Sequence, residues 1–359
     1  MLRFIRPLLV APLALMLLSC SPDAQNKSDQ TVVLYTSADD TFARMVVEQF
    51  TKDTGIQVAI VGDTEATKTT GLVARIKSEA LNPQADVWWS SEPFGTIDLT
   101  STNALLPEAM SKLVPSDWPA ELIAEDGSWV GFASRARVIA YATERVPTPP
   151  TTLREFAQPM WKDRIGMARP QFGTTRGHMG IIVNQWGLAE FERWLEMLAN
   201  NNIRLYDGNA SVVRAIAMGE IDVGLTDTDD VWSGQRNDWK LDCVYDAFDP
   251  PMNLDTLGSR GPVLLPNTVG IVSGAPHPEL AQQLAAYLIS PTVESLLAMS
   301  ESRNIPANPE LSDLFSLYAP RSLTAGDPNR VQGQSIYPNF SDAASAISSA
   351  LDACDLHLP

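Results

Sequence analysis

Short apolar runs alternate with amphipathic segments in the first third of the chain. The runs are rich in β-branched and aromatic residues, which is typical of buried strands, and the segments between them repeat apolar residues at helical spacing. The predicted order is strand, helix, strand, helix, strand, over residues 31–35, 42–54, 56–61, 67–80 and 85–89. Because the links are short, we expect a parallel sheet with its polar terminal loops at one edge.

A second unit of the same kind occupies the middle of the chain. Its strands and helices are predicted over residues 164–168, 177–186, 191–200, 203–206, 210–218 and 221–225. Two extended runs, 129–141 and 263–272, contain no helix and join this unit to the first one. We therefore expect two α/β lobes linked by two crossings. Further helices are predicted over residues 279–289, 292–299 and 342–352.

A dense acidic stretch follows the strand predicted at 221–225. Asp227, Asp229 and Asp230 place three carboxylates within four residues. Ligands of open α/β sheets collect beyond the carboxyl ends of strands, and carboxylate oxygens bind hard cations. A structural interpretation is also open, because aspartates cap helices and offset the helix dipole.

Length and charge narrow the class of protein. A chain of 359 residues exceeds one ordinary core and suggests two domains. The formal net charge of −17 argues against nucleic acid as a partner and is compatible with a cationic ligand. The sequence has only three histidines and no GxSxG, HExxH or Walker motif, so we do not expect an enzyme.

The N-terminal segment has the organisation of an export signal. A basic region precedes an apolar run at 8–18, which is too short to span a membrane, and the sequence Leu-Leu-Ser-Cys ends at Cys20. This ending resembles a bacterial lipobox, so residues 1–20 are expected to be a lipoprotein signal peptide and Cys20 the lipidated residue. An ordinary signal peptide cleaved nearby is the alternative. Residues 21–30 are polar and are predicted to form a flexible tether.

Cysteine usage agrees with export to an oxidising compartment. With Cys20 lipidated, Cys243 and Cys354 remain as an even pair, and we expect a disulfide between them. Two unrelated buried thiols are the alternative. Metal binding through sulfur is not expected, because no CxxC motif or cluster of cysteine and histidine occurs.

Arginines fall near the same predicted edge as the aspartates, at Arg135, Arg137, Arg169 and Arg176. Each of them alone is commonly a surface or ion-paired residue. Together with the carboxylates they predict a cleft of mixed charge. Such a cleft suits a metal ion with a counter-anion, or a zwitterion.

Six stretches of the sequence carry a resemblance to a known family. They are Val33-Leu-Tyr-Thr-Ser, Phe50-Thr-Lys-Asp-Thr-Gly-Ile-Gln-Val, Pro83-Gln-Ala-Asp-Val-Trp-Trp, Ser134-Arg-Ala-Arg-Val-Ile-Ala-Tyr, Met160-Trp-Lys-Asp-Arg-Ile-Gly and Ala217-Met-Gly-Glu-Ile-Asp-Val-Gly-Leu. From about residue 31 to about residue 308, the chain resembles the type II periplasmic solute-binding proteins of ABC importers, and within them the ferric-iron-binding group.

The resemblance implies a two-lobed type II periplasmic-binding-protein fold of the α/β class, with two hinge crossings and a cleft that closes on its ligand. The lobes that it implies are residues 31–133 plus 267–308 and residues 134–266 plus 309–359. Cys243 and Cys354 would both belong to the second lobe, which makes the disulfide plausible.

The resemblance also implies the metal ligands. In the iron-binding group the first loop often supplies a histidine, the third loop a glutamate, and two adjacent tyrosines follow the last strand. Here Asp39 falls near the histidine position and Glu92 fits the glutamate, while Asp229 and Asp230 replace the tyrosines. The expected metal donors are Asp39, Glu92, Asp227, Asp229 and Asp230. Phenolates select ferric iron, whereas carboxylates bind Ca²⁺, Mg²⁺, Mn²⁺ and iron with less discrimination.

In the same group an arginine and a turn rich in threonine and serine hold a synergistic anion beside the metal. Arg135, Arg137, Thr174 and Thr175 fit those positions. The resemblance thus implies a metal ion, such as iron, together with an anion.

The expected function is that of a monomeric, extracytoplasmic lipoprotein, periplasmic or on the cell surface, which meets the membrane through its lipid anchor only. It would deliver its ligand to an ABC permease and the associated ATPase. Three alternatives stay open. One is a binder of a small organic cation or a phosphorylated molecule, another is a hydrolase, and the third is a structural surface lipoprotein.

Overall fold

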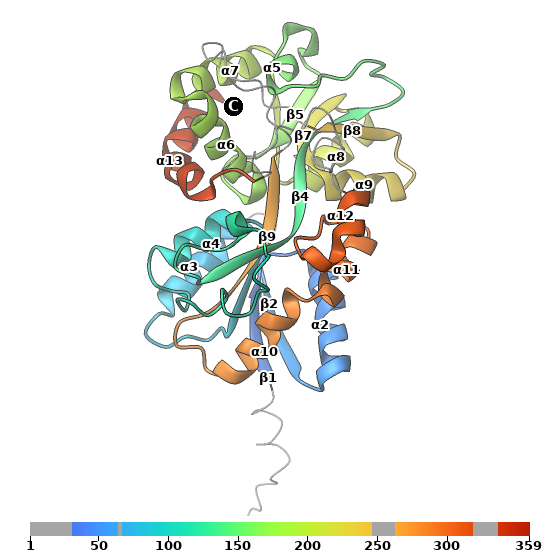
Figure 1. The fold of residues 1–359 in the computed structure, drawn as a ribbon. Coiled ribbons are helices and arrows are strands. Elements are labelled where there is room, and N and C mark those ends of the chain that lie inside the picture. Colours follow the sequence, from blue (N-terminus) through green and yellow to red (C-terminus); the bar gives the residue numbers. More distant parts are fainter. Residues whose placement is uncertain (1–30, 64–66, 246–262, 319–336) are drawn as a thin grey trace, which may run out of the picture.

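The computed structural model describes residues 31–63, 67–245, 263–318 and 337–359 (Figure 1). The predicted signal peptide, its Cys20 and the tether lie outside the described residues. Figure 1 shows two lobes joined by the long strand β4 and its neighbour β9. Among the described residues, no helix combines the length and the apolar character needed to cross a membrane.

The first lobe is built on parallel strands that the apolar runs near the N-terminus predict. These are β1 (Thr31–Thr36), β2 (Gln57–Gly62) and β3 (Val87–Ser90), with β1 in the middle. The helices of this lobe are α2 (Asp40–Thr54), α3 (Thr70–Ser78), α4 (Pro93–Thr100), α10 (Pro278–Leu288) and α11 (Pro291–Met299), with a 3₁₀ turn η2 (Ala120–Leu122). The apolar side chains of α2 at helical spacing are buried, and the helix ends at Gly55 in the left-handed conformation, as the pattern predicts.

The second lobe repeats this arrangement. Its strands are β5 (Ile165–Ala168), β6 (Arg204–Tyr206), β7 (Val223–Asp227) and β8 (Leu241–Tyr245), and β5 pairs in parallel with both β6 and β7. Its helices are α5 (Leu153–Phe156), α6 (Gly173–Trp186), α7 (Leu188–Asn200), α8 (Asn209–Met218), α9 (Thr228–Arg236) and α13 (Phe340–His357), with a 3₁₀ turn η3 (Pro159–Trp161). The C-terminal helix α13 packs on α6 and α7 (Figure 1).

The two lobes are joined by β4 (Trp129–Ala142) and β9 (Leu264–Ile271), which run antiparallel. The first half of β4 pairs with β9, and its second half pairs with β7 on one side and β8 on the other. The strand order is therefore β2-β1-β3-β9-β4-β7-β5-β6, with β8 also on β4. After β9, the short elements η4 (Pro309–Leu311) and α12 (Ser312–Tyr318) pack on α11.

Several helices begin earlier than the sequence pattern predicts. Helix α6 starts at Gly173 instead of 177, and α8 starts at Asn209 instead of 210. Helix α9 starts at Thr228, so that Asp229 and Asp230 lie in its first turn. Glycine and β-branched threonine have low intrinsic helix propensity, which favours a turn at 173–176 when the sequence is taken alone. The hydrogen bond from Thr174 to Asp227 on β7, described below, outweighs this preference.

The predicted disulfide is not formed. Cys243 on β8 and Cys354 on α13 are free thiols. Strand β8 packs against β4 and α9, whereas α13 packs against α6 and α7 on the other side of the lobe (Figure 1). Burial, followed by the neighbouring Asp242 and Asp355 carboxylates respectively, raises the pKa of each thiol to about 12, so both stay protonated.

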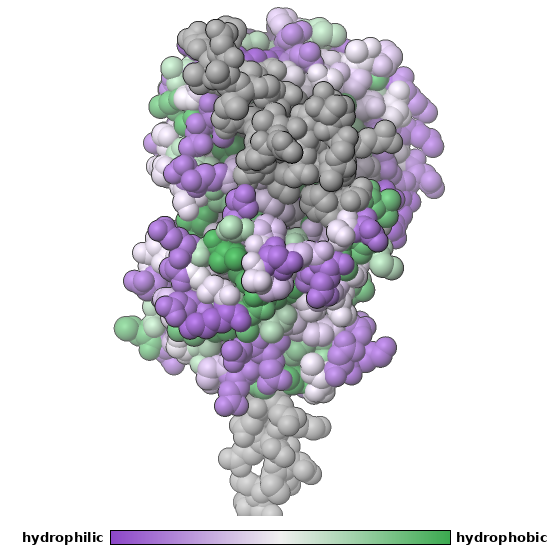
Figure 2. Space-filling view, viewed as in Figure 1, coloured by the Kyte–Doolittle hydropathy of each residue, from purple (hydrophilic) through white to green (hydrophobic). Residues whose placement is uncertain are grey.

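The outer surface carries most of the polar residues. On the face shown in Figure 2, hydrophilic and intermediate residues predominate over hydrophobic ones in both lobes. The large aromatic side chains Trp88, Trp89 and Phe132 are instead fully buried close to the crossing strands.

Candidate functional site

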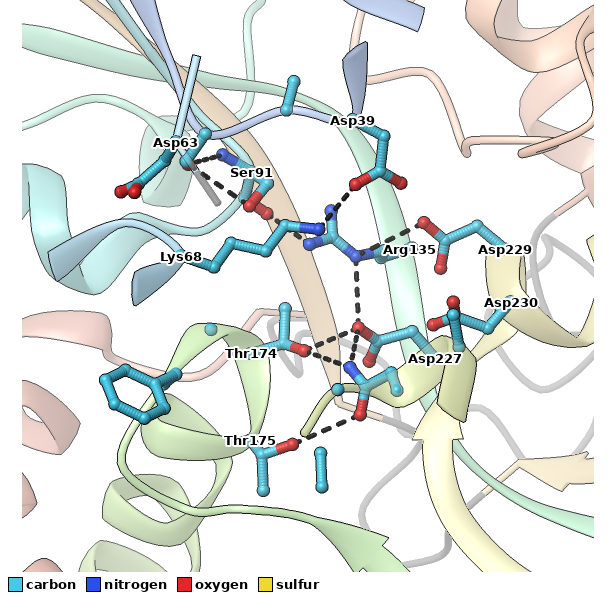
Figure 3. Close-up of a pocket in the computed structure, with 18 of the residues that line it drawn as sticks. Asp39, Asp63, Lys68, Ser91, Arg135, Thr174, Thr175, Asp227, Asp229 and Asp230 are labelled. Atoms are coloured by element: carbon cyan, nitrogen blue, oxygen red, sulfur yellow. Dashed lines mark hydrogen bonds and ion pairs between the residues drawn. The ribbon is translucent and has the colours of Figure 1, made fainter. Parts of the chain in front are cut away.

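A cavity of about 400 Å³ lies between the two lobes (Figure 3). The first lobe contributes loops that follow its parallel strands, with Asp39 after β1 and Ser91 after β3. The second lobe contributes Asp227 at the end of β7 and Thr174 at the start of α6. Parallel strands end at the same edge of each sheet, which is why residues far apart in the sequence meet here.

Asp227 is the most fully bonded residue of the cavity. Arg137 Nη1 donates to its Oδ1 at 2.6 Å, while Thr174 Oγ1 and Asn209 Nδ2 donate to its Oδ2 at 2.6 and 2.9 Å. Arg135 Nε lies 3.3 Å from the same Oδ2. Burial by itself would raise the pKa of Asp227, but Arg137 and Arg135 outweigh it and lower that pKa. Asp227 therefore stays ionised, with both of its oxygens engaged.

The residues predicted to hold an anion surround this carboxylate. Arg137 and Thr174 bind Asp227 directly, and Thr175 Oγ1 donates to Asn209 Oδ1 at 3.3 Å. Arg137 Nε also approaches His178 Nδ1 at 3.3 Å, and within the described part of the chain Arg137 Nη2 has no hydrogen-bond partner. The anion that these groups bind in this structure is thus a side chain of the protein itself.

The acidic stretch is not explained as a helix cap. Asp227 stands at the N-cap position of α9, yet its side chain accepts no capping hydrogen bond. Its oxygens point to the arginines and to Thr174 instead (Figure 3). Asp229 and Asp230 lie in the first turn, where negative charge interacts favourably with the helix dipole. That interaction does not require their carboxylates to lie close to the carboxylate of Asp227.

Asp229 and Asp230 complete a cluster of three carboxylates. One oxygen from each of Asp227, Asp229 and Asp230 lies within 4.8 Å of the other two, and the cluster is the one group of potential metal ligands found among the described residues. Asp229 Oδ2 is 3.7 Å from Arg135 Nε, whereas its Oδ1 is buried and has no hydrogen-bond partner in the described part of the chain. Thr226 Oγ1 donates to Asp230 Oδ2 at 3.4 Å.

These two carboxyl groups resist ionisation. Burial raises the pKa of Asp229 to about 6 against the attraction of Arg135, and the charges of Asp227 and Asp39 add to the rise. The pKa of Asp230 is raised well above its ordinary value by burial and then by Asp229 and Asp227. Like charges gathered in a poorly solvated place repel one another, and a bound cation removes that repulsion. The pair is therefore suited to exchange protons for a cation.

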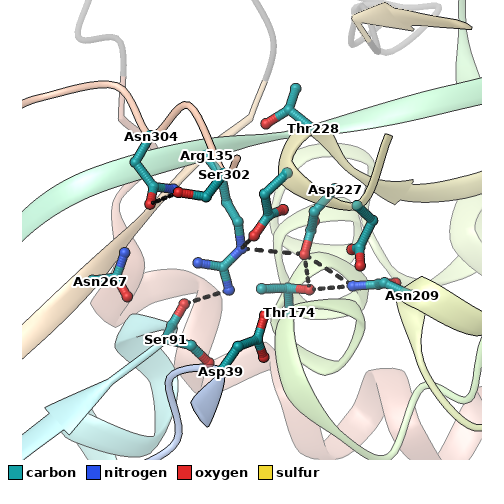
Figure 4. A network of polar contacts seen from close by, with 12 residues as sticks. Asp39, Ser91, Arg135, Thr174, Asn209, Asp227, Thr228, Asn267, Ser302 and Asn304 are labelled. Carbon is teal, nitrogen blue, oxygen red and sulfur yellow. Dashed lines mark hydrogen bonds and ion pairs between the residues drawn. The ribbon is translucent and has the colours of Figure 1, made fainter. Parts of the chain in front are cut away.

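Arg135 links the two lobes across the cavity (Figure 4). It extends from β4, donates from Nη2 to the backbone oxygen of Ser91 in the first lobe at 2.5 Å, and ion-pairs with Asp227 of the second lobe. Burial opposes its charge, but Asp229 and Asp227 outweigh burial and raise the pKa of Arg135. This guanidinium is thus a fixed positive charge beside the carboxylates.

The first lobe brings Asp39 to the cavity but not Glu92. Asp39 Oδ1 lies 2.5 Å from Lys68 Nζ, and although burial opposes ionisation, Lys68 lowers the pKa of Asp39. The Glu92 side chain caps α4, accepting hydrogen bonds from the backbone N–H of Phe94 at 2.6 Å and of Gly95 at 3.0 Å. It lines a separate cavity of about 160 Å³ together with Arg176. The structure does not place Glu92 with the aspartates, because the helix N-terminus holds it.

Other residues that the sequence analysis did not assign to the site also line the cavity. They include Lys68, Ser91, Asn209 and Asn267. Asn209 had a usable signal, because it follows the strand predicted at 203–206 and so falls at the same sheet edge. Lys68 had none, because it lies within a predicted helix. Among the described residues, no tyrosine lines the cavity.

Known proteins give this geometry its context. Residues 31–299 match the family described as bacterial extracellular solute-binding protein. Iron uptake protein A1 of Synechocystis sp. is 27% identical over 307 residues, which cover 79% of this chain and 80% of that protein. The major ferric iron-binding protein of Neisseria meningitidis is 24% identical over 303 residues, covering 84% and 88%. The crystal structure of iron-bound HitA from Pseudomonas aeruginosa has a TM-score of 0.72 at 22% identity and covers 90% of this chain and 99% of its own.

The fold and the comparisons agree. The solved structure shares the two-lobed architecture, and the matches confirm the predicted resemblance to type II periplasmic binding proteins of the ferric-binding group. They also confirm the expectation of a binding protein and not an enzyme. The family match covers most of the described chain, from β1 to α11. The chain is a member of the bacterial extracellular solute-binding protein family.

Proposed function

We propose that this protein captures an iron ion at Asp229 and Asp230 and delivers it to an ABC permease and its ATPase. It would do so as a monomer held at the cell envelope by a lipid on Cys20. The observation that carries the proposal is the carboxylate cluster, in which Asp227 is paired with two arginines while one buried oxygen of Asp229 has no hydrogen-bond partner among the described residues. The names of the relatives, an iron uptake protein and a ferric iron-binding protein, support iron as the cation.

Asp229 and Asp230 would be the principal donors. Because the pKa values of Asp229 and Asp230 are raised, a cation that binds there would displace protons. It would not have to break a strong ion pair within the protein. Asp39 faces the same cavity from the first lobe and is a further candidate donor when the lobes close. Because no tyrosine lines the cavity in the described part of the chain, the set would bind iron with less preference over manganese or calcium than a phenolate site would.

Asp227 would also take the place of an added anion. It already accepts hydrogen bonds from Arg137 and Thr174 and pairs with Arg135, so a carbonate or phosphate would have to displace it from these residues. Cation affinity should therefore change less than about threefold, below 1 kcal/mol, when bicarbonate, phosphate or citrate is added at fixed free metal.

A second candidate ligand is a small zwitterion that carries an ammonium and a phosphate or phosphonate group. Lys68, Arg135 and Arg169 line the cavity together with Asp229 and Asp230, and its volume of about 400 Å³ exceeds the needs of a bare ion. In that case Asp229 and Asp230 would bind the ammonium group. The same titrations separate the two candidates.

Calorimetric titration of the purified protein with iron, manganese and calcium tests the proposal. Asp229→Asn should weaken cation binding at least tenfold, or about 1.4 kcal/mol, because it removes a charged donor. Glu92→Gln is the matched control, since Glu92 is a buried carboxylate that lies outside the cluster. It should leave affinity unchanged and reduce stability by about 0.5–2 kcal/mol, the usual effect of losing a helix cap.

The proposal fails if the wild-type protein binds none of these metals, or if Asp229→Asn and Glu92→Gln have equal effects on affinity. Binding of an ammonium-bearing phosphonate without any metal, lost in Asp229→Asn, would establish the zwitterion instead. Intact-mass analysis of membrane-extracted protein tests the anchor separately, because a lipid on Cys20 adds a diacylglyceryl-sized mass.

A further inference from the structure

The crossing strand β4 breaks at the point where it passes between the lobes. Its register with β9 shifts between Phe132 and Arg135. Ala133 within this break has φ of +44°, in the left-handed region that non-glycine residues rarely adopt. A break of this kind bends a strand and re-aims the side chains that follow. The first side chain after the break that enters the cavity is Arg135.

A buried carboxylate from α11 holds the break in place. Glu294 is 0% exposed, and its Oε1 accepts hydrogen bonds from the backbone N–H of Ala133 at 2.6 Å and of Ala307 at 2.9 Å. Its Oε2 accepts from the N–H of Asn308 at 2.6 Å. One side chain thus fixes the crossing strand to the segment that follows α11.

The neighbouring groups tie the same point to the cavity. Asn267 on the second crossing strand donates from Nδ2 to the Ala133 oxygen at 2.6 Å, and Asn267 lines the cavity. Ser134 and Ile305 exchange two backbone hydrogen bonds of 2.7 Å, and Asn304 next to Ile305 also lines the cavity. Figure 4 shows Asn267 and Asn304 on the same side of Arg135, opposite Asp227. The Ala133 peptide is therefore held from α11, from β9 and from residue 305.

We propose that Glu294 is a positioning residue for solute binding, which holds Ala133 in the left-handed conformation and so directs Arg135 into the cleft between the lobes. Arg135 reaches Ser91 of the first lobe and Asp227 of the second, so its direction decides how the lobes meet. Glu294 itself is not among the residues that line the described cavity. The choice of metal ions as titration probes rests on the proposed function. The rest of the inference does not depend on it.

The chain provides a matched control for a merely structural role. Asp86 is also 0% exposed and accepts from the N–H of Val33 at 2.7 Å and of His277 at 2.6 Å, with His277 Nδ1 at 3.0 Å. It ties β1 to the segment before α10, beside the Ile271 end of β9 and not at the break in β4, and it does not line the cavity. Glu294→Gln and Asp86→Asn both replace one carboxyl oxygen that accepts from backbone N–H donors with an amide nitrogen, so both should lower the melting temperature.

Hydrogen–deuterium exchange of the ligand-free proteins tests the hinge without any ligand. Glu294→Gln should speed exchange of the amides at 132–136 at least tenfold relative to Asp86→Asn, because only Glu294 bonds the Ala133 amide. Equal exchange of these amides in the two variants overturns the inference. This result stands even if the protein binds no metal, so it is independent of the proposed function.

Titration with manganese and iron tests the action through Arg135. Glu294→Gln should change the affinity at least fivefold, and that change should fall below twofold in an Arg135→Gln background. It should also fall below twofold in an Ala133→Gly background, since glycine adopts positive φ without help. A change that is the same in all backgrounds overturns the inference. If Glu294→Gln does not fold, Glu294→Asp replaces it, because the shorter side chain keeps the charge but cannot reach all three amides.

Discussion

The two sides of the cleft hold their carboxylates in opposite ways. In the first lobe, Asp39 is paired with Lys68, and Glu92 is held by the N-terminal amides of α4. In the second lobe, Asp227 engages both nearby arginines, and Asp229 with Asp230 is left without a full counter-charge. The carboxyl groups of the cavity that lack a full counter-charge therefore lie on the second lobe.

This difference separates two uses of the same chemical group. A carboxylate whose partners are built in contributes to the fold and is insensitive to solutes. A carboxylate without partners, kept close to others, is destabilised until a proton or a cation arrives. We infer that a cation first meets the second lobe, and that the first lobe then closes over it through Arg135 and Asp39.

The largest expected effect comes from breaking the built-in ion pairs of Asp227. Asp227→Asn leaves Arg135 and Arg137 buried without their counter-charge, so stability should fall by about 3–5 kcal/mol in urea unfolding. Asp222 is the control, because it also pairs with two arginines, Arg145 at 2.5 Å and Arg164 at 2.6 Å, both of which are 39% exposed. Asp222→Asn should cost only about 0–1 kcal/mol. Equal losses would show that burial does not distinguish the two clusters.

The next effect concerns an apolar contact between the lobes. A Cβ at Gly177 on α6 would overlap the ring of Phe94 on α4. Gly177→Ala should therefore cost about 1–3 kcal/mol or force the lobes apart. Thermal unfolding and the radius from small-angle scattering report the two outcomes. Gly62→Ala is the control, since no atom lies within 4 Å of its added Cβ. Unchanged stability and radius in Gly177→Ala would mean that the lobes do not meet at this point in solution.

The pH dependence of cation binding should reveal the raised pKa of Asp229. Because the pKa of Asp229 is raised to about 6, cation affinity should fall below pH 6 by up to about tenfold per unit, as protons compete for the site. The stability of the cation-free protein should show the opposite dependence on pH. The folded state binds this proton more tightly than the unfolded chain, so the contribution of Asp229 to stability falls as pH rises from about 4 to about 6. Titrations and melting curves at pH 5, 6 and 7 measure both trends, and Asp229→Asn should flatten them.

The smallest effect is expected in the first lobe. The Asp39 side chain is 45% exposed, so its ion pair with Lys68 should contribute no more than about 1 kcal/mol. Asp39→Asn should leave the melting temperature nearly unchanged and weaken cation binding less than Asp229→Asn does. A loss of affinity as large as that of Asp229→Asn would place the primary donors on both lobes and remove the contrast between the two sides of the cleft.

The sequence predicted the elements and the general place of the site. The runs at 31–35 and 221–225 became β1 and β7, and the extended run at 129–141 became the crossing strand β4. Strand-end loops carrying Asp39, Thr174 and the acidic stretch meet at one cavity, as the parallel order implies. The sequence could not predict the state of the cysteines, because distance in space between β8 and α13 is a property of lobe packing.

What the sequence determined by itself is local: the periodicity of apolar residues, the order of the strands and the presence of carboxylates and arginines beyond the strand ends. Only the tertiary structure decided which charges are paired. In it, Asp227 pairs with two arginines and Glu92 caps the N-terminus of α4. Asp229 and Asp230 lie close enough together to repel each other when both are ionised. The physical reason is that pairing depends on distances of a few ångströms and on burial, and both are set by how the two lobes pack on β4 and β9.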